Sequence, residues 1–154
     1  MKNIVISLQS RQLRNGLRNA KDYPFANELI KLLHDVPLKT IQVGSNGERD
    51  IGCNEKRLGL KLCELKEIII SADFFVSIDN FLQHYATYLG KKGIVIFSKS
   101  DPLIYGYDNN INILKDRKYL RKDQFSVWEE CPYDHDAFIT PDIVVKSLFS
   151  IVNP

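Results

Sequence analysis

The sequence has few cysteines, little net charge and no long apolar run. Its three cysteines, Cys53, Cys63 and Cys131, form no C-x-x-C pair, which argues against disulfides and structural zinc and fits a reducing cytoplasm. A formal net charge of +2 gives no overall indication of a nucleic-acid partner or a membrane surface. No apolar stretch approaches the roughly 20 residues of a membrane-spanning helix.

Three motifs of parallel-sheet enzymes are also missing. Without G-x-G-x-x-G after the first expected strand, a dinucleotide-dependent oxidoreductase is disfavoured. The lack of a Walker A lysine motif and of a G-x-S-x-G elbow argues against a P-loop NTPase and an α/β-hydrolase. The run Asp134-His135-Asp136 has metal-ligand residue types, but three adjacent side chains do not easily converge on one ion, so no metal is expected.

What remains is the composition of an ordinary globular domain. The 154 residues are 44% hydrophobic and 26% charged, with no internal repeat, which predicts one domain with a sizeable core. The N-terminal MKNIVISLQSRQ is interpreted as a first strand rather than a signal peptide. Its apolar run is too short, and arginines follow where a small-residue cleavage site would lie.

Short apolar runs alternate with helical patterns along the chain. Strands are expected at 4–9, 40–43, 72–78, 93–97 and near 111–114. Helices are expected from Pro24 to about Val36, along the stripe from Leu58 to Ile69, over 80–89, and after Thr140 at the C-terminal end. The segment 116–138 has no clear pattern. The alternation predicts an α/β, Rossmann-like three-layer domain with a central parallel sheet, which binds ligands at the carboxyl ends of its strands.

The loop after the first expected strand is basic. Arginine and lysine there can hold phosphate oxygens, and the loop leads to a helix N-terminus. A solvated basic surface loop is the alternative, since charge runs are often only surface. The loop residues concerned are Ser10, Arg11, Arg14, Arg18 and Lys21.

The loop after the second strand reads GSNGE, from Gly44 to Glu48. Its glycines permit close approach of a ligand. Glu48 can accept hydrogen bonds from two ribose hydroxyls, as the acidic residue of dinucleotide-binding folds does. The alternative is a plain turn with an exposed glutamate.

The third strand ends on Asp79 and Asn80 and leads directly into a helix. We expect Asp79 to cap that helix, leaving other backbone N–H groups for an anion. His84 is placed on the polar side, where it can donate to a phosphate or a sugar hydroxyl, while the apolar side chains of the helix face the core. The alternative is a structural cap with a histidine at the edge of the core. The inward residues expected are Phe81, Leu82, Tyr85 and Leu89.

Together these loops resemble the C-terminal, nucleotide-sugar-binding half of the family 9 glycosyltransferases, the lipopolysaccharide heptosyltransferases and their relatives. That family has the two-domain GT-B fold. Its Lys-Arg-Trp-Pro, Gly-x-x-x-Glu, Asp-Ser-Gly-x-x-His and Phe-Gly-x-Thr-x-Pro patterns fall here on 21–24, 44–48, 79–84 and 97–102. The resemblance covers roughly 4–102, and the later segments QFSVWEEC and FITPDIVVKSLFSIV also fit.

The resemblance implies a role for each loop. Ser10 and Lys21 would hold a diphosphate, with Arg11 and Arg18 nearby, and Glu48 beside Gly44 would take the ribose. The start of the third helix would hold the diphosphate or the donor sugar without a metal. Two departures concern this helix start, where Phe81 stands in place of the family's glycine and Asn80 in place of its hydroxyl residue; Ser98 replaces another glycine. The residues implied at the helix start are Asp79, Asn80, Phe81 and His84.

Three functions are compatible with these patterns. The chain is a glycosyltransferase for hexosyl or heptosyl transfer, or the donor-binding half of one, with the acceptor domain absent from 1–154 and supplied by a separate chain. Alternatively, it is a non-catalytic module that binds a nucleotide or nucleotide sugar. The third interpretation is an interaction protein with a retired pocket that meets a partner or a second copy of itself. Two further interpretations stay open: the chain is a shortened protein that binds without catalysis, or it is a fragment of a longer enzyme.

Overall fold

The structure is a computed structural model that describes residues 1–152. Its centre is one sheet of six parallel strands in the order β3-β2-β1-β4-β5-β6. The α/β fold class and the parallel sheet expected from the sequence are therefore confirmed. The strands are β1 (Lys2–Ser7), β2 (Leu38–Gly44), β3 (Glu55–Leu58), β4 (Phe74–Ile78), β5 (Gly93–Phe97) and β6 (Ile111–Leu114).

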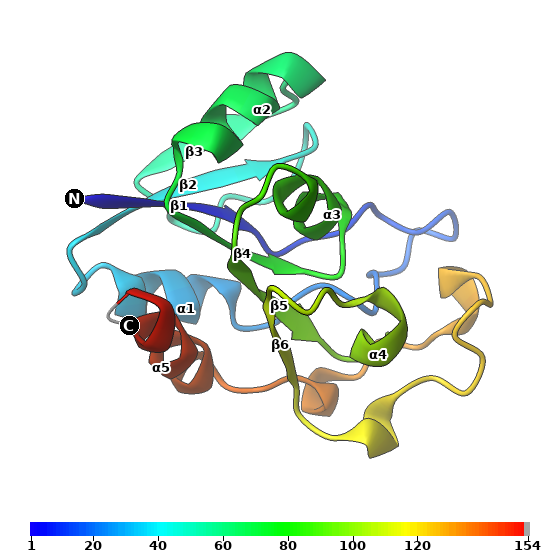
Figure 1. The fold of residues 1–154 in the computed structure, drawn as a ribbon. Coiled ribbons are helices and arrows are strands. Elements are labelled where there is room, and N and C mark those ends of the chain that lie inside the picture. Colours follow the sequence, from blue (N-terminus) through cyan, green and yellow to red (C-terminus); the bar gives the residue numbers. More distant parts are fainter. Residues whose placement is uncertain (153–154) are drawn as a thin grey trace.

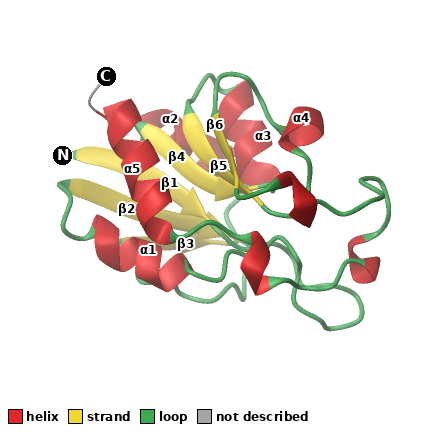
Figure 2. Cartoon of the chain, turned by 90° about the horizontal axis from the view of Figure 1, so that it is seen from below, coloured by secondary structure: helices red, strands yellow, loops and turns green. Residues whose placement is uncertain are grey.

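Helices cover both faces of this sheet. In Figure 1, α1 and α5 lie together on one face, and α2 and α3 lie on the other. Figure 2, seen from below, shows α1 and α5 in front of the strands. The helices are α1 (Ala26–Leu33), α2 (Leu62–Ser71), α3 (Phe81–Tyr88), α4 (Pro102–Tyr105) and α5 (Pro141–Val152), with short 3₁₀ turns at Arg117–Tyr119, Trp128–Glu130 and His135–Ala137.

Each face of the sheet has its own apolar core, because successive side chains of a strand point to opposite faces. Ile4 and Ile6 of β1 pack with α1 and α5 in one core. Val5 of the same strand packs in the other core with Phe75, below α2 and α3. Strand β5 is buried along its whole length. This double burial is why the central strands show as continuous apolar runs in the sequence.

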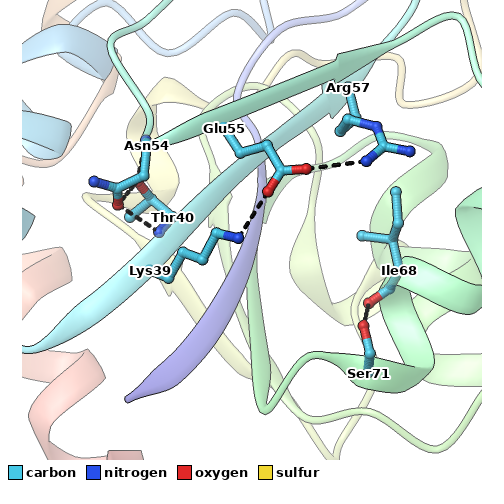
Figure 3. A network of polar contacts seen from close by, with 7 residues as sticks. All are labelled: Lys39, Thr40, Asn54, Glu55, Arg57, Ile68 and Ser71. Carbon is cyan, nitrogen blue, oxygen red and sulfur yellow. Dashed lines mark hydrogen bonds and ion pairs between the residues drawn. The ribbon is translucent and has the colours of Figure 1, made fainter.

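The edge strand β3 was missed by the sequence reading. Glu55–Leu58 is a polar edge strand without apolar periodicity, and Leu58 belongs to it rather than to the following helix. Its neighbour Asn54 is fixed to β2, since its Oδ1 accepts from the backbone N–H (2.8 Å) and the hydroxyl (2.9 Å) of Thr40. Glu55 then pairs with Lys39 at 2.8 Å and Arg57 at 3.0 Å (Figure 3).

Helix α3 differs from the expectation in its cap and its buried face. Asn80, not Asp79, is the N-cap, and its side chain accepts from the N–H of Leu82 at 3.1 Å. Phe81 is 58% exposed, whereas Gln83 is fully buried. The buried residues of the helix are Leu82, Gln83 and Ala86, so the buried face begins at its second residue. Gly90 closes the helix with φ +77°, as expected.

The segment that lacked a sequence pattern is held by side-chain bonds to backbone carbonyls. Gln124 Nε2 donates to Lys99 O and Arg121 O, both at 2.9 Å. Arg121 in turn donates to Ser126 O at 2.9 Å and Gln124 O at 2.8 Å. Such bonds impose no periodicity, so the pattern of apolar residues could not reveal them.

The three cysteines differ in how deeply their thiols are buried. Cys53, Cys63 and Cys131 are all free thiols; Cys63 is exposed, Cys53 half-buried and Cys131 buried. Burial raises the pKa of the Cys53 thiol to about 12.

Among residues 1–152, no helix is long and apolar enough to cross a membrane.

Candidate functional site

The candidate site lies where the strand order reverses. Strands β1 and β4 are neighbours at the centre of the sheet, and the chain leaves them toward helices on opposite faces. Open α/β sheets bind ligands in the crevice at this place. Asn80 joins the two strand ends: its Nδ2 donates to Ser7 Oγ at 2.9 Å and to Gln9 O at 3.1 Å.

A cavity of about 650 Å³ opens at this edge of the sheet. We call it the binding pocket. Its volume is typical of ligand sites, which range over about 300–1,000 Å³. The loops after β1, β2, β3 and β4 line it together with the start of α2, through Ser7, Gln9, Ser10, Arg11, Lys21, Val43, Gly44, Ser45, Asn46, Glu48, Arg57, Gly59, Leu60, Leu62, Leu65, Asn80, Phe81 and Leu82.

Glu48 folds back over Gly44 inside the binding pocket. Its Oε1 accepts the backbone N–H of Ser45 at 2.9 Å, and a Cβ on Gly44 would overlap the carboxylate. The absence of a side chain at 44 therefore leaves room for the Glu48 carboxylate in this position. The other oxygen, Oε2, is buried and has no hydrogen-bond partner among residues 1–152. Burial raises the pKa of the Glu48 carboxyl, and the nearby Asp22 adds to that rise.

Lys21 is the half-buried cation of the pocket. Burial lowers the pKa of its ammonium group, the nearby Asp79 carboxylate opposes that effect, and Arg121 adds to it. The Nζ atom lies 5.0 Å from the centre of the Trp128 ring, and the Arg121 guanidinium lies 3.6 Å from the same ring. Trp128 and Arg121 belong to the segment without a sequence pattern, so sequence reasoning had no signal for either of them.

Asp22 fixes the start of the basic loop through a hydrogen bond to its backbone. Its Oδ1 accepts the backbone N–H of Ser10 at 2.6 Å. Burial raises the pKa of the Asp22 carboxyl, while the Ser10 bond and the positive charge of Arg18 oppose the rise. Ser10 is thereby bonded to the residue that follows Lys21, although Ser10 and Lys21 are eleven positions apart in the chain.

The structure separates the expected site residues into two groups. Seven line the binding pocket, namely Ser10, Arg11, Lys21, Gly44, Glu48, Asn80 and Phe81. Arg18, Asp79 and His84 do not line it. The guanidinium of Arg18 lies 4.2 Å from the ring centre of Tyr133.

Asp79 and His84 form a separate polar cluster on α3. Asp79 is buried and accepts from Gln83 Nε2 at 2.6 Å, so it supports the helix although it is not the cap. His84 is half-exposed; its Nε2 lies 3.8 Å from Asp79 Oδ1 and its Nδ1 lies 2.9 Å from the Tyr107 hydroxyl. This geometry resembles the structural alternative raised for His84 more than a direct ligand contact.

The pocket also contains apolar residues that sequence reasoning did not assign to it. Leu60, Leu62 and Leu65 line it from the start of α2. Two of these leucines belonged to the apolar stripe that was expected to face the core. Leu62 is 57% exposed, so its side chain faces the pocket and the solvent more than the core.

Comparisons with known proteins agree on the fold. No protein-family model matches the sequence, and no curated protein matches it. Among solved structures, E. coli heptosyltransferase WaaC with ADP has a TM-score of 0.68 and 18% identity, over 97% of this chain and 44% of that one. E. coli ADP-heptose lipopolysaccharide heptosyltransferase II has a TM-score of 0.73 and 19% identity, over 98% of this chain and 46% of that one. A glycosyltransferase of family 9 from Veillonella parvula has a TM-score of 0.73 and 14% identity, over 98% of this chain and 46% of that one.

The chain has a glycosyltransferase-like fold. It spans less than half the length of these three structures, and nearly all of it is matched. The neighbours are GT-B glycosyltransferases, so the Rossmann-like, GT-B-type domain expected from the loop motifs is confirmed at the level of the fold.

Proposed function

We propose that the binding pocket holds a nucleoside-diphosphate sugar, as the donor-binding unit of a glycosyltransferase. The observation that carries this proposal is Glu48 Oε2, a buried carboxylate oxygen with no partner among residues 1–152, on a residue that lines the pocket together with Lys21. An unpaired buried acceptor is costly, and a ligand hydroxyl would satisfy it. The pocket lies in a fold shared with a heptosyltransferase solved with ADP.

The two sides of the pocket suggest which part of the ligand each would take. In this proposal, a ribose hydroxyl donates to Glu48, and the diphosphate lies near Ser10, Arg11 and Lys21. When the sugar leaves, negative charge grows on the diphosphate, and fixed cations there stabilise the transition state more than the ground state. Asp79 and His84 act indirectly in this proposal, by supporting α3.

Transfer of the sugar also needs an acceptor and a general base. We propose that a further domain or a separate chain provides them, because the solved neighbours are more than twice as long as this chain. The three free thiols fit a cytoplasmic setting, where nucleotide sugars are used.

A non-catalytic binding module is the second candidate. Phe81 at the first position of α3 favours it, because its side chain occupies the place at which the resembled family has a bare glycine backbone. Both candidates require nucleotide binding. They separate only when donor hydrolysis or transfer is assayed.

Calorimetric titration with ADP, GDP, UDP and CDP and their common sugar conjugates tests the shared requirement. We expect saturable binding of one nucleotide series, at least about tenfold weaker in Lys21→Ala and in Glu48→Ala, because each loses a charge-assisted bond of about 1.5–3 kcal/mol. Lys31→Ala, in the last turn of α1, removes the same charge outside the pocket and serves as the matched control. No binding by the folded wild-type chain would refute the proposal.

A further inference from the structure

Phe81 stands at the mouth of the binding pocket as an exposed aromatic side chain. It is 58% exposed and lines the pocket, whereas the next two residues of the helix, Leu82 and Gln83, are buried. Its ring centre lies 5.4 Å from that of Tyr85, one turn later in α3, at an interplanar angle of 37°. Tyr85 in turn reaches the start of α2, where its hydroxyl donates to Leu62 O at 3.5 Å. The Phe81 ring is thus backed by a second ring on one side and open to the pocket.

Phe81 continues an apolar surface that begins on α2. Leu60, Leu62 and Leu65 line the same pocket, and Leu62 is as exposed as Phe81, at 57%. We call these four side chains the apolar wall. Helices α2 and α3, which carry most of it, lie on one face of the sheet (Figure 1). The basic residues Arg11 and Lys21 belong to the loop that leads to α1 on the opposite face.

The pocket is therefore amphipathic. Arg11 and Lys21 line it from the loop after β1, and the apolar wall lines it mainly from α2 and α3. A third cation, Arg57, lines it at the end of β3 and pairs with Glu55 at 3.0 Å.

Glu48 and Asn80 line the pocket from the loops after β2 and β4. A diphosphate alone would contact the basic residues and would leave the exposed side chains of Leu62 and Phe81 in water. A ligand with a charged end, a hydroxyl-bearing middle and a flat apolar end would match all three parts.

Phe81 does not fill the pocket. With the ring in place, the cavity still measures about 650 Å³, which is ample for a nucleoside diphosphate. The Asn80 side chain already accepts the N–H of Leu82 at 3.1 Å. The start of α3 therefore offers a ligand the Phe81 ring as its main new surface, where a glycine would offer bare backbone.

We propose that the apolar wall is the nucleobase subsite and that Phe81 is the residue that packs against the base. This inference rests on the proposed function and names the part of the nucleotide that Phe81 recognises. Aromatic side chains stack on bases of any sequence, because every base has a π-face. Phe81 then contributes to nucleotide affinity instead of blocking it.

The experiment compares a ligand with a base and one without. Calorimetry gives Kd for the tightest-binding nucleoside diphosphate among ADP, GDP, UDP and CDP, and for inorganic pyrophosphate, on wild type, Phe81→Ala and Phe81→Trp. We expect Phe81→Ala to weaken the nucleotide by about tenfold and to leave pyrophosphate unchanged, while Phe81→Trp keeps wild-type affinity. Tyr88→Ala, an 84% exposed aromatic on the same helix outside the pocket lining, controls for surface truncation and should change neither Kd.

The outcomes separate this inference from the function on which it rests. Equal or tighter nucleotide binding by Phe81→Ala would overturn the inference, since the ring would then obstruct the ligand. An equal loss of pyrophosphate affinity would also overturn it, because Phe81 would then act on the phosphate side. If wild type binds neither ligand, the proposed function itself fails, and the inference fails with it.

Discussion

Replacing Gly44 by alanine should displace Glu48 without unfolding the protein. A Cβ at position 44 would overlap all three terminal atoms of the Glu48 side chain, Oε2 most closely, so the carboxylate must move by more than about 1 Å to reach an ordinary non-bonded separation. The backbone of Gly44 does not have a positive φ, so alanine itself is tolerated there. Because the obstacle is the end of a flexible side chain, the main loss is the bond from the Ser45 N–H, about 1 kcal/mol in the free energy of unfolding.

Gly44→Ala should also lower nucleotide affinity. Because the added methyl group forces the Glu48 carboxylate away from its place in the pocket, Gly44→Ala should bind nucleotide almost as weakly as Glu48→Ala, at least about tenfold more weakly than the wild type. Urea unfolding and calorimetric titration measure the two effects on the same samples. Gly90→Ala is the matched control, because it forces alanine into a φ of +77° far from the pocket and should lower stability without changing affinity. Wild-type affinity in Gly44→Ala would refute the role given to Glu48.

Three further predictions concern charge. Nucleotide affinity of the wild type should decrease while pH is still below 10.5, the usual lysine value, because burial lowers the pKa of Lys21; Lys21→Arg should remove that decrease in calorimetric titrations. Asp79→Ala should lower the free energy of unfolding in urea by about 1–3 kcal/mol, because it leaves a buried amide without its acceptor, whereas the half-exposed His84→Ala should change it by about 0.5 kcal/mol or less. Hydrogen bonding to Arg117 lowers the pKa of Asp101 below 3.8, so Asp101→Asn should destabilise the protein at neutral pH, and the difference from wild type should vanish in acid as Asp101 protonates.

The buried part of the fold could be predicted from the sequence, because burial on both faces leaves a continuous apolar run. The strand at 93–97 was located to the residue for this reason. Strand β3 was missed because its face at the sheet edge is solvated, so Glu55–Leu58 carries no apolar alternation. Its pairing depends on Asn54 and Lys39, which are distant contacts that no local pattern encodes.

At the candidate site, the start of helix α3 could not be predicted to the residue for a similar reason. Asp79 and Asn80 are both good capping residues, and the chain direction at the end of β4 decides between them. In the structure Phe81 lines the pocket, opposite to its expected inward orientation, whereas Leu82 is buried as expected and Gln83, which was not assigned to either side, is buried too. The loops themselves were correctly located at the carboxyl edge, since parallel strands place all their C-terminal ends together. The roles assigned to Ser10, Lys21 and Glu48 stay predictions until ligand binding is measured.

The unequal exposure of the three thiols gives this chain a built-in reporter position. The nucleophile in thiol labelling is the thiolate, and burial raises the pKa of both Cys53 and Cys131. Cys63 is exposed and follows Leu62 of the apolar wall directly in the chain. An environment-sensitive maleimide dye should therefore attach at Cys63 in the unmodified sequence, and its emission would follow the filling of the pocket in real time.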